Sequence, residues 1–91
     1  MSIDDLINKQ LIMDRKQILL KIQDVFRSEL DAKDLQIEEE TTIFDIEEWD
    51  SLSHIVICGA LEKLFNVKFT AREMLSCESI SSLIDAISKK I

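Results

Sequence analysis

A capping residue followed by apolar side chains at helical spacing recurs along this chain, and this local pattern narrows the possible folds more than any other feature. Asp14 and Gln17 have the spacing of a capping box. The residues behind them predict a helix over 15–30 with these apolar positions: Ile18, Ile22, Val25, Phe26 and Leu30. The chain has no proline and one glycine, so helices joined by polar connectors are favoured over a sheet.

A second helix is predicted to begin at Asp50 or Ser51 and to end near Asn66. The side chains expected on its buried stripe are Leu52, Ile55, Val56, Leu61, Leu64 and Phe65. Gly59 lies inside this helix, where glycine costs about 1 kcal/mol relative to alanine. Two explanations stay open for it: a tight contact between helices, or a spot without a side chain that admits cargo or a partner.

Two shorter helices complete the prediction. Thr70 and Glu73 have capping-box spacing and predict a brief third helix through Leu75, after an extended piece over 67–69. Ser79 predicts the start of the last helix, whose apolar face is expected to be Ile80, Leu83, Ile84, Ile87 and Ile91. The expected fold is therefore an all-α four-helix bundle with a long first loop and a short third helix.

The connector over 31–50 shows no helical period, and twenty residues is long for a loop in a compact domain. To be ordered, this loop needs side chains that pack into the core. Those expected to do so are Leu35, Ile37, Ile43, Phe44 and Ile46, with Trp49 packed at the end of the loop. The same stretch holds nine acidic residues against the single Lys33. This charge argues against nucleic-acid binding and for a partner with a basic surface.

Residues 1–14 are expected to form an extension outside a domain over 15–91. Ser2 and Asp5 could cap an extra helix there, and that segment could dock a partner, form a dimer contact or continue the first core helix. A monomer is the expected state.

No signal peptide or membrane-spanning stretch is visible, so we expect a cytoplasmic location and no membrane insertion. Cys58 and Cys77 lack a close pairing motif, so we expect two free, buried thiols.

Ser51 is the leading candidate functional residue. At the start of a helix its hydroxyl would lie in solvent beside backbone N–H groups, where the helix dipole favours an attached phosphate, although a serine there can also be a simple cap. His54 and Cys58 follow at one-turn intervals, but no suitably placed carboxylate, nucleophile elbow or further metal ligand accompanies them. We therefore expect no catalytic and no metal site, and His54 at the surface or its boundary.

The sequence resembles the acyl and peptidyl carrier proteins over about 15–90. The run Asp50-Ser51-Leu52 is similar to their attachment motif, and the other similar stretches are Ala60-Leu61-Glu62, Phe65-Asn66-Val67 and Ser79-Ile80. The resemblance implies a carrier-protein bundle with 4'-phosphopantetheine bound to Ser51, beside Asp50 and Leu52. It also implies that a phosphopantetheinyl transferase attaches this group from coenzyme A, and that a loading ligase and a downstream transferase or synthase use the resulting acyl or aminoacyl thioester. Such a discrete carrier is itself not an enzyme.

The sequence differs from many fatty-acid carriers around this motif. Glu48-Trp49 precedes Asp-Ser where those carriers have a glycine, and Ser53 and Val56 stand where they have acids. Recognition of partners is therefore expected to depend on a mixed apolar and acidic set: Glu47, Glu48, Ile55, Val56, Gly59 and Glu62. The form Trp-Asp-Ser-Leu is more similar to carriers of specialised bacterial pathways.

An alternative function fits the same composition, namely an unmodified acidic helical adaptor that docks a basic partner protein. Ser51 separates the two hypotheses, because a carrier requires its hydroxyl and an adaptor would lose only a helix cap in Ser51→Ala. An enzyme is the third hypothesis, and it would require turnover without coenzyme A.

Overall fold

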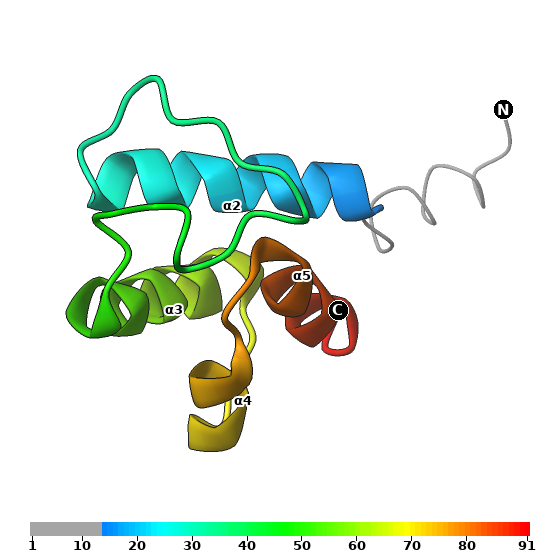
Figure 1. Ribbon diagram of the computed structural model, residues 1–91. Coiled ribbons are helices and arrows are strands. Elements are labelled where there is room, and N and C mark those ends of the chain that lie inside the picture. The colour runs from blue at the N-terminus through cyan, green and yellow to red at the C-terminus, as the bar shows by residue number, and fades with distance from the viewer. Residues whose placement is uncertain (1–13) are drawn as a thin grey trace, which may run out of the picture.

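The computed structural model describes residues 14–91, and the expected extra helix before residue 14, with its Ser2 and Asp5 cap, lies outside the described residues. Over residues 14–91 the chain forms four helices and no named strand. The helices are α2 (Arg15–Glu29), α3 (Ser51–Phe65), α4 (Ala71–Ser76) and α5 (Ile80–Ser88). In Figure 1, α2 lies above α3 and α5, and the short α4 lies below them, on the side away from α2. The predicted all-α bundle with a short third helix is confirmed.

Each cap predicted within residues 14–91 is present. The Asp14 carboxylate accepts the Gln17 N–H at 2.8 Å, and the Gln17 side chain accepts the Asp14 N–H at 3.2 Å, so a capping box opens α2. Thr70 and Glu73 form the same reciprocal pair at the start of α4, and Ser79 accepts the Ser82 N–H at the start of α5. These local hydrogen bonds fix where the helices begin.

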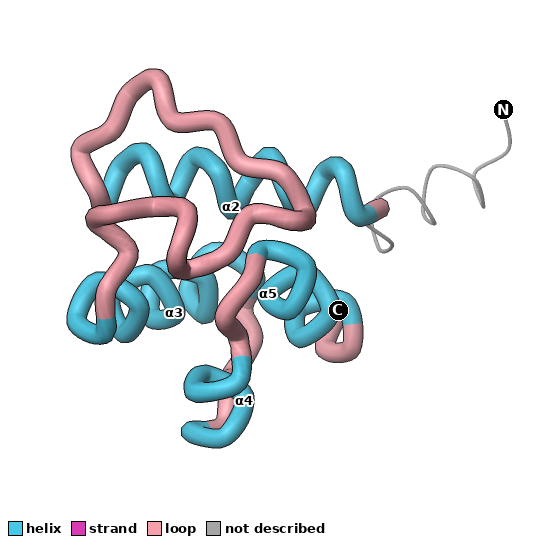
Figure 2. The backbone as a smooth tube through the Cα atoms, in the orientation of Figure 1, coloured by secondary structure: helices cyan, strands magenta, loops and turns pink. Residues whose placement is uncertain are grey.

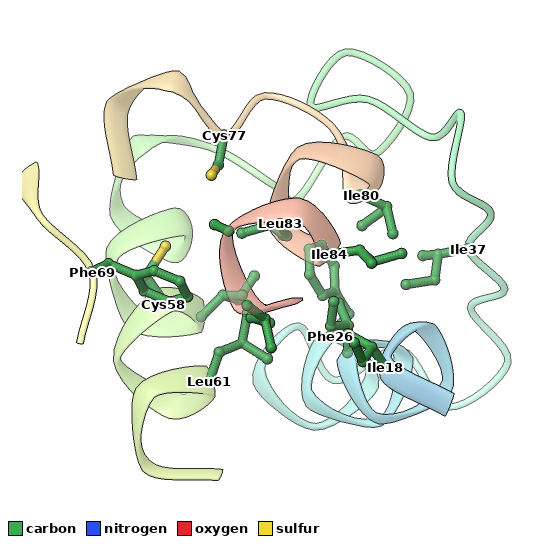
Figure 3. Packing of buried hydrophobic residues seen from close by; sticks show 14 of the residues in the cluster. Ile18, Phe26, Ile37, Cys58, Leu61, Phe69, Cys77, Ile80, Leu83 and Ile84 are labelled. Atoms are coloured by element: carbon green, nitrogen blue, oxygen red, sulfur yellow. The ribbon is translucent and has the colours of Figure 1, made fainter. Parts of the chain in front are cut away.

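The core is formed mainly by one face each of α2 and α5 together with α3 (Figure 3). The fully buried residues of α2 and α5 are those expected: Ile18, Ile22, Phe26, Ile80, Leu83, Ile84 and Ile87. Cys58 and Cys77 are free and buried, as predicted. The prediction for Ile91 is wrong, because α5 ends at Ser88 and Ile91 lies beyond it, where it is 44% exposed.

The buried face of α3 differs in part from the predicted stripe, of which Leu61 is buried and Phe65 is half-buried against the core. Its buried residues are His54, Ile57, Cys58 and Leu61, and the large apolar residues left exposed are Leu52, Ile55, Val56 and Leu64. Apolar side chains surround most of this helix, so spacing alone could not tell which side meets α2 and α5. The result is a helix with one apolar face in the core and another in solvent.

The acidic loop, residues 31–50, crosses the bundle and is tied to the start of α5 by backbone hydrogen bonds (Figure 2). Ile43 donates to the Glu78 carbonyl at 2.8 Å, and Ile80 donates to the Thr41 carbonyl at 2.9 Å. Further ties come from α2, where Gln23 accepts the Ile37 N–H and Arg27 donates to the Leu35 carbonyl. These bonds order a segment that has no helix or strand of its own.

Side chains of the acidic loop reach the core at intervals, as predicted, with one exception. Ile37 and Ile46 are buried, and Leu35 and Ile43 are half-buried against the core. Phe44, however, is 87% exposed, so its expected burial is wrong. It lies in the turn where Asp45 accepts the Thr42 N–H, and this turn carries the Phe44 ring outward. The loop therefore presents an aromatic side chain to solvent.

Candidate functional site

The start of α3 is set by a reciprocal pair of hydrogen bonds between Asp50 and Ser53. The Asp50 carboxylate accepts the Ser53 N–H at 2.9 Å, and the Ser53 hydroxyl oxygen accepts the Asp50 N–H at 2.8 Å. The Ser53 hydroxyl also donates to the Glu48 carbonyl at 2.8 Å. These contacts lower the pKa of Asp50, chiefly through the Ser53 backbone, and the carboxylate remains charged beside the positive end of the helix dipole. Of the two predicted caps, Asp50 is the one used.

Ser51 is consequently the first residue of α3, and it is exposed. Its neighbours 50 and 53 hold the cap, whereas no hydrogen bond between described residues occupies the Ser51 hydroxyl. The side chain stands at the N-terminal end of a fifteen-residue helix, where a negatively charged substituent is favoured. Of the side chains in this turn, Ser51 is therefore the one whose hydroxyl group can be modified.

A groove of about 390 Å³ opens beside Ser51, although the sequence indicated no pocket there. Its walls come from α3, from α4 with the segment that follows it, and from the acidic loop, and the lining residues are Ile43, Ser51, His54, Ile55, Ala71, Met74, Leu75, Cys77 and Glu78. The lining is mainly apolar, apart from Ser51, His54 and Glu78. A pocket that joins four separate segments cannot be read from the spacing within any one of them.

His54 was expected at the surface or its boundary; it is buried and lines this groove, so an exposed position is wrong. The Trp49 indole N–H donates to Nδ1 of His54 at 3.0 Å, and Nε2 of His54 lies 2.6 Å from the carbonyl oxygen of Met74. Because α4 and the end of the acidic loop both close over the ring, burial is decided by tertiary contacts that the helical period does not encode. In the sequence, the one indication that His54 could be buried was Trp49, five residues before it.

The same contacts exclude Ser51–His54 nucleophilic catalysis in this arrangement. Both ring nitrogens of His54 are already hydrogen-bonded, so neither can accept the Ser51 proton. Cys58 Sγ lies 3.7 Å from His54 Nε2, but burial raises the pKa of the Cys58 thiol to about 12, which keeps it protonated and unreactive. Within residues 14–91 no group of three or more His, Cys, Asp or Glu residues is placed to hold a metal.

The residues expected to dock partners occupy two positions. Ile55 and Val56 are 62% and 52% exposed on the outer face of α3, and Glu47 and Glu48 are exposed on the acidic loop just before it. These four side chains flank the Ser51 end of the helix.

The other two expected docking residues, Gly59 and Glu62, lie further along α3 and line a second groove of about 360 Å³. The Glu62 carboxylate accepts the Phe69 N–H at 2.8 Å, so one of its two oxygens already has a hydrogen-bond partner within the fold. A Cβ added at Gly59 would meet no atom within 4 Å. A tight helix contact therefore does not explain this glycine.

Two of three comparisons with known proteins gave a match. The family model described as "phosphopantetheine attachment site" matches residues 20–87. The structure is similar to the solution NMR structure of the holo acyl carrier protein from Geobacter metallireducens, with a TM-score of 0.73 and 32% sequence identity over 79% of this chain and 83% of that chain. The comparison with curated proteins gives no significant match.

Proposed function

Because the chain belongs to the family of acyl and peptidyl carrier proteins, which bear a covalently attached 4'-phosphopantetheine, we propose that Ser51 is the residue that carries this group. On this proposal the protein holds an acyl or aminoacyl intermediate of a biosynthetic pathway as a thioester. The observation that carries the proposal is the exposed Ser51 hydroxyl at the first position of α3, beside an apolar groove.

Five other serines of the described chain are less suitable acceptors, because their hydroxyl groups take part in hydrogen bonds. Ser53 is held within the α3 cap, and Ser76 donates to the Glu73 carbonyl. Ser79 and Ser82 are bonded to each other at 2.9 Å, and Ser81 accepts a hydrogen bond from Arg15. Ser51 combines an exposed hydroxyl with the positive end of a long helix, so its surroundings fit a phosphodiester.

The chain supplies the acceptor for this modification and little of its catalysis. The Ser51 oxygen forms a bond to the phosphorus of coenzyme A as the pyrophosphate linkage of that molecule breaks, and the nucleotide part leaves. The hydroxyl proton must be taken up by the phosphopantetheinyl transferase, because the nearby His54 has no free nitrogen. Once bound, the cofactor supplies the thiol that carries the intermediate. Asp50 keeps the first turn of α3 ordered and charged for recognition by the transferase.

The exposed face of α3 supports a docking role for the residues that surround Ser51. Leu52, Ile55 and Val56 present apolar surface there, while Glu47 and Glu48 add negative charge at its edge. A loading ligase and a downstream transferase or synthase with an apolar contact surface and basic groups beside it would match this arrangement. None of the helices that the structure describes is long and apolar enough to cross a membrane. We place these reactions in the cytoplasm.

The test is intact-mass measurement after incubation with coenzyme A, Mg²⁺ and a promiscuous phosphopantetheinyl transferase. The wild-type protein should gain one phosphopantetheine, and Ser51→Ala should gain none. Ser53→Ala is the matched control, because it removes the other hydroxyl of the same helical turn and should still be modified.

Circular dichroism must show that all three proteins are folded. A folded wild-type chain that gains no mass, while a known carrier is modified in the same tube, would overturn the proposal and favour the unmodified adaptor. Added mass on Ser51→Ala would place the attachment elsewhere.

A further inference from the structure

His54 is the buried polar residue of the described core, and its hydrogen bonds determine where its proton lies. The Trp49 indole nitrogen can only donate, so Nδ1 of His54 must accept that bond and carries no proton. Nε2 then carries the proton and donates to the Met74 carbonyl at 2.6 Å. The ring is thus held as the neutral Nε2–H tautomer, with both nitrogens paired.

These two bonds connect segments that are distant from each other in the chain. Trp49 belongs to the acidic loop and is fixed in the core against Phe26 of α2, whereas Met74 belongs to α4. Among the described residues, the His54–Met74 bond is the one hydrogen bond that joins α3 to α4. His54 therefore links α4 to the rigid part of the bundle.

α4 has few other attachments. It is six residues long, none of them buried, and Met74 is only half-buried against the core. The Glu73 carboxylate pairs with Lys90 at 3.0 Å, but both side chains are partly exposed, and such pairs contribute little. A helix with so little buried surface depends on individual polar contacts for its position.

The position of α4 also determines the shape of the groove beside Ser51. Ala71, Met74 and Leu75 line it from α4, and Ser51, His54 and Ile55 line it from α3. A shift of α4 relative to α3 would widen or close this groove. The His54–Met74 bond crosses between these two walls.

We propose that His54 is a positioning residue, whose Nε2–H···O=C bond to Met74 fixes α4 and thereby the opening of the groove, with Trp49 holding the ring in the required tautomer. Whether this groove receives a group attached to Ser51 rests on the proposed function above. The link itself does not, because it involves no cofactor and can be tested in the unmodified protein.

A pair of substitutions separates the two bonds. The amide oxygen and nitrogen of asparagine are one bond from Cγ, which is also the position of Nδ1 in histidine. His54→Asn can therefore keep an acceptor for Trp49 but cannot reach Met74. Glutamine extends one bond further, as Nε2 does, so His54→Gln can keep a donor for Met74 but gives up the Trp49 bond. Both variants remove the aromatic ring, so loss of core volume affects them alike.

The measurement is amide hydrogen exchange and chemical shift in the unmodified protein, resolved by NMR. In His54→Asn, the protected amides of residues 74–77 should exchange about tenfold faster, as loss of a hydrogen bond worth about 1.4 kcal/mol predicts. In His54→Gln they should stay within about threefold of wild type, while the Trp49 indole N–H signal moves. Ile57→Val, which removes one methyl group from the same helix, should leave α4 unchanged.

Equal effects of the two variants on α4 would overturn the proposal, since His54 would then act only by filling space. The tautomer gives an independent check that needs no variant: imidazole ¹⁵N shifts of the wild type should show Nδ1 unprotonated and Nε2 protonated, and the reverse pattern would also overturn it. Modification by the transferase, measured by mass on the same samples, reports separately on Ser51. A failure of the positioning role of His54 is thereby distinguished from a failure of the proposed modification of Ser51.

Discussion

The indole ring of Trp49 meets the ring of Phe26 edge to face, with ring centroids 4.8 Å apart and an interplanar angle of 87°. Phe26 belongs to α2, and Trp49 is the last residue before the cap of α3. The contact joins the end of the acidic loop to the core within two residues of Ser51. The position of the candidate attachment site is therefore set by core packing as well as by the local cap.

Replacing Trp49 with alanine should lower the free energy of unfolding by about 3–5 kcal/mol, because a fully buried aromatic side chain is lost and a cavity remains. Trp49→Phe should cost less, since a ring is retained against Phe26. Urea denaturation followed by circular dichroism measures both. Phe44→Ala is the matched control on the same loop, and its exposed side chain should change stability by less than about 0.5 kcal/mol. Similar losses for Trp49→Ala and Phe44→Ala would contradict the role assigned to Trp49.

The sequence predicted those features that depend on neighbouring residues. The capping pairs Asp14–Gln17 and Thr70–Glu73 lie three residues apart, so their spacing is sufficient to place the helix starts. The helix start at Asp50 or Ser51 was predicted from the preference of these residue types for N-cap positions, and the structure shows that Asp50 is the cap.

What could not be predicted depends on contacts between distant segments. His54 is buried because Trp49 and Met74 close over it, and Phe44 is exposed because the Thr42–Asp45 turn directs it outward. The predicted buried stripe of α3 was correct for Leu61 but wrong for Ile55, because apolar residues such as Ile55 and Ile57 occur on opposite faces of the helix and only packing chooses between them.

Removing the cap in Asp50→Ala should lower the thermal midpoint by a few degrees at neutral pH, because the Ser53 N–H loses its acceptor. The pKa of Asp50 is lowered in the folded state from 3.8. The stabilisation by its charge is therefore present above about pH 4 and is lost as pH falls through the folded-state pKa. Thermal scans from pH 7 to pH 3 should show the wild type and the variant converging in acid. A difference that persists unchanged at low pH would contradict this account, and Asp50→Asn, which keeps an uncharged cap, separates charge from hydrogen bonding.

Gly59→Ala should stabilise the protein by about 0.5–1 kcal/mol, because alanine is the better helix former and the added Cβ meets no atom within 4 Å. Chemical denaturation of the unmodified variant measures this gain. Ala60→Gly, at the next helical position and half-buried, is the reciprocal control and should destabilise by a similar amount or more. A loss of stability in Gly59→Ala would mean that the backbone at this position is approached more closely than the structure shows.

Asn66 ends α3 in the left-handed conformation, with φ 55° and ψ 50°. Glycine adopts this conformation without a steric cost, and asparagine tolerates it better than most residues. Asn66→Gly should therefore keep or slightly raise stability, whereas Asn66→Ala should lower it by about 1 kcal/mol. Urea denaturation of the two variants provides the comparison, and Ser88→Ala, exposed at the end of α5, serves as a surface control. Equal stability of Asn66→Gly and Asn66→Ala would show that the conformation of this residue does not matter.

Alkaline pH should destabilise the protein through its buried thiols. Burial raises the pKa of Cys58 from 9.0 to about 12, and it raises the pKa of Cys77 as well. For a group whose folded-state pKa is raised, unfolding releases a proton once pH exceeds the unfolded value, so stability is complete below about pH 9 and falls between pH 9 and pH 12. Each such thiol can contribute at most about 1.4 kcal/mol per pH unit.

Urea denaturation at pH 8, 9, 10 and 11 measures this loss, and the absence of tyrosine from the chain removes one competing titration. Cys58→Ala should be less stable at pH 8, because a small cavity is created, yet its stability should fall less steeply above pH 9. Cys77→Ala should retain the part of the slope that Cys58 causes. The native Cys58 thiol should also resist iodoacetamide at pH 8, where the unfolded chain reacts. An alkaline slope that is the same in wild type and Cys58→Ala would show that this thiol titrates normally in the folded protein, against the burial on which the argument rests.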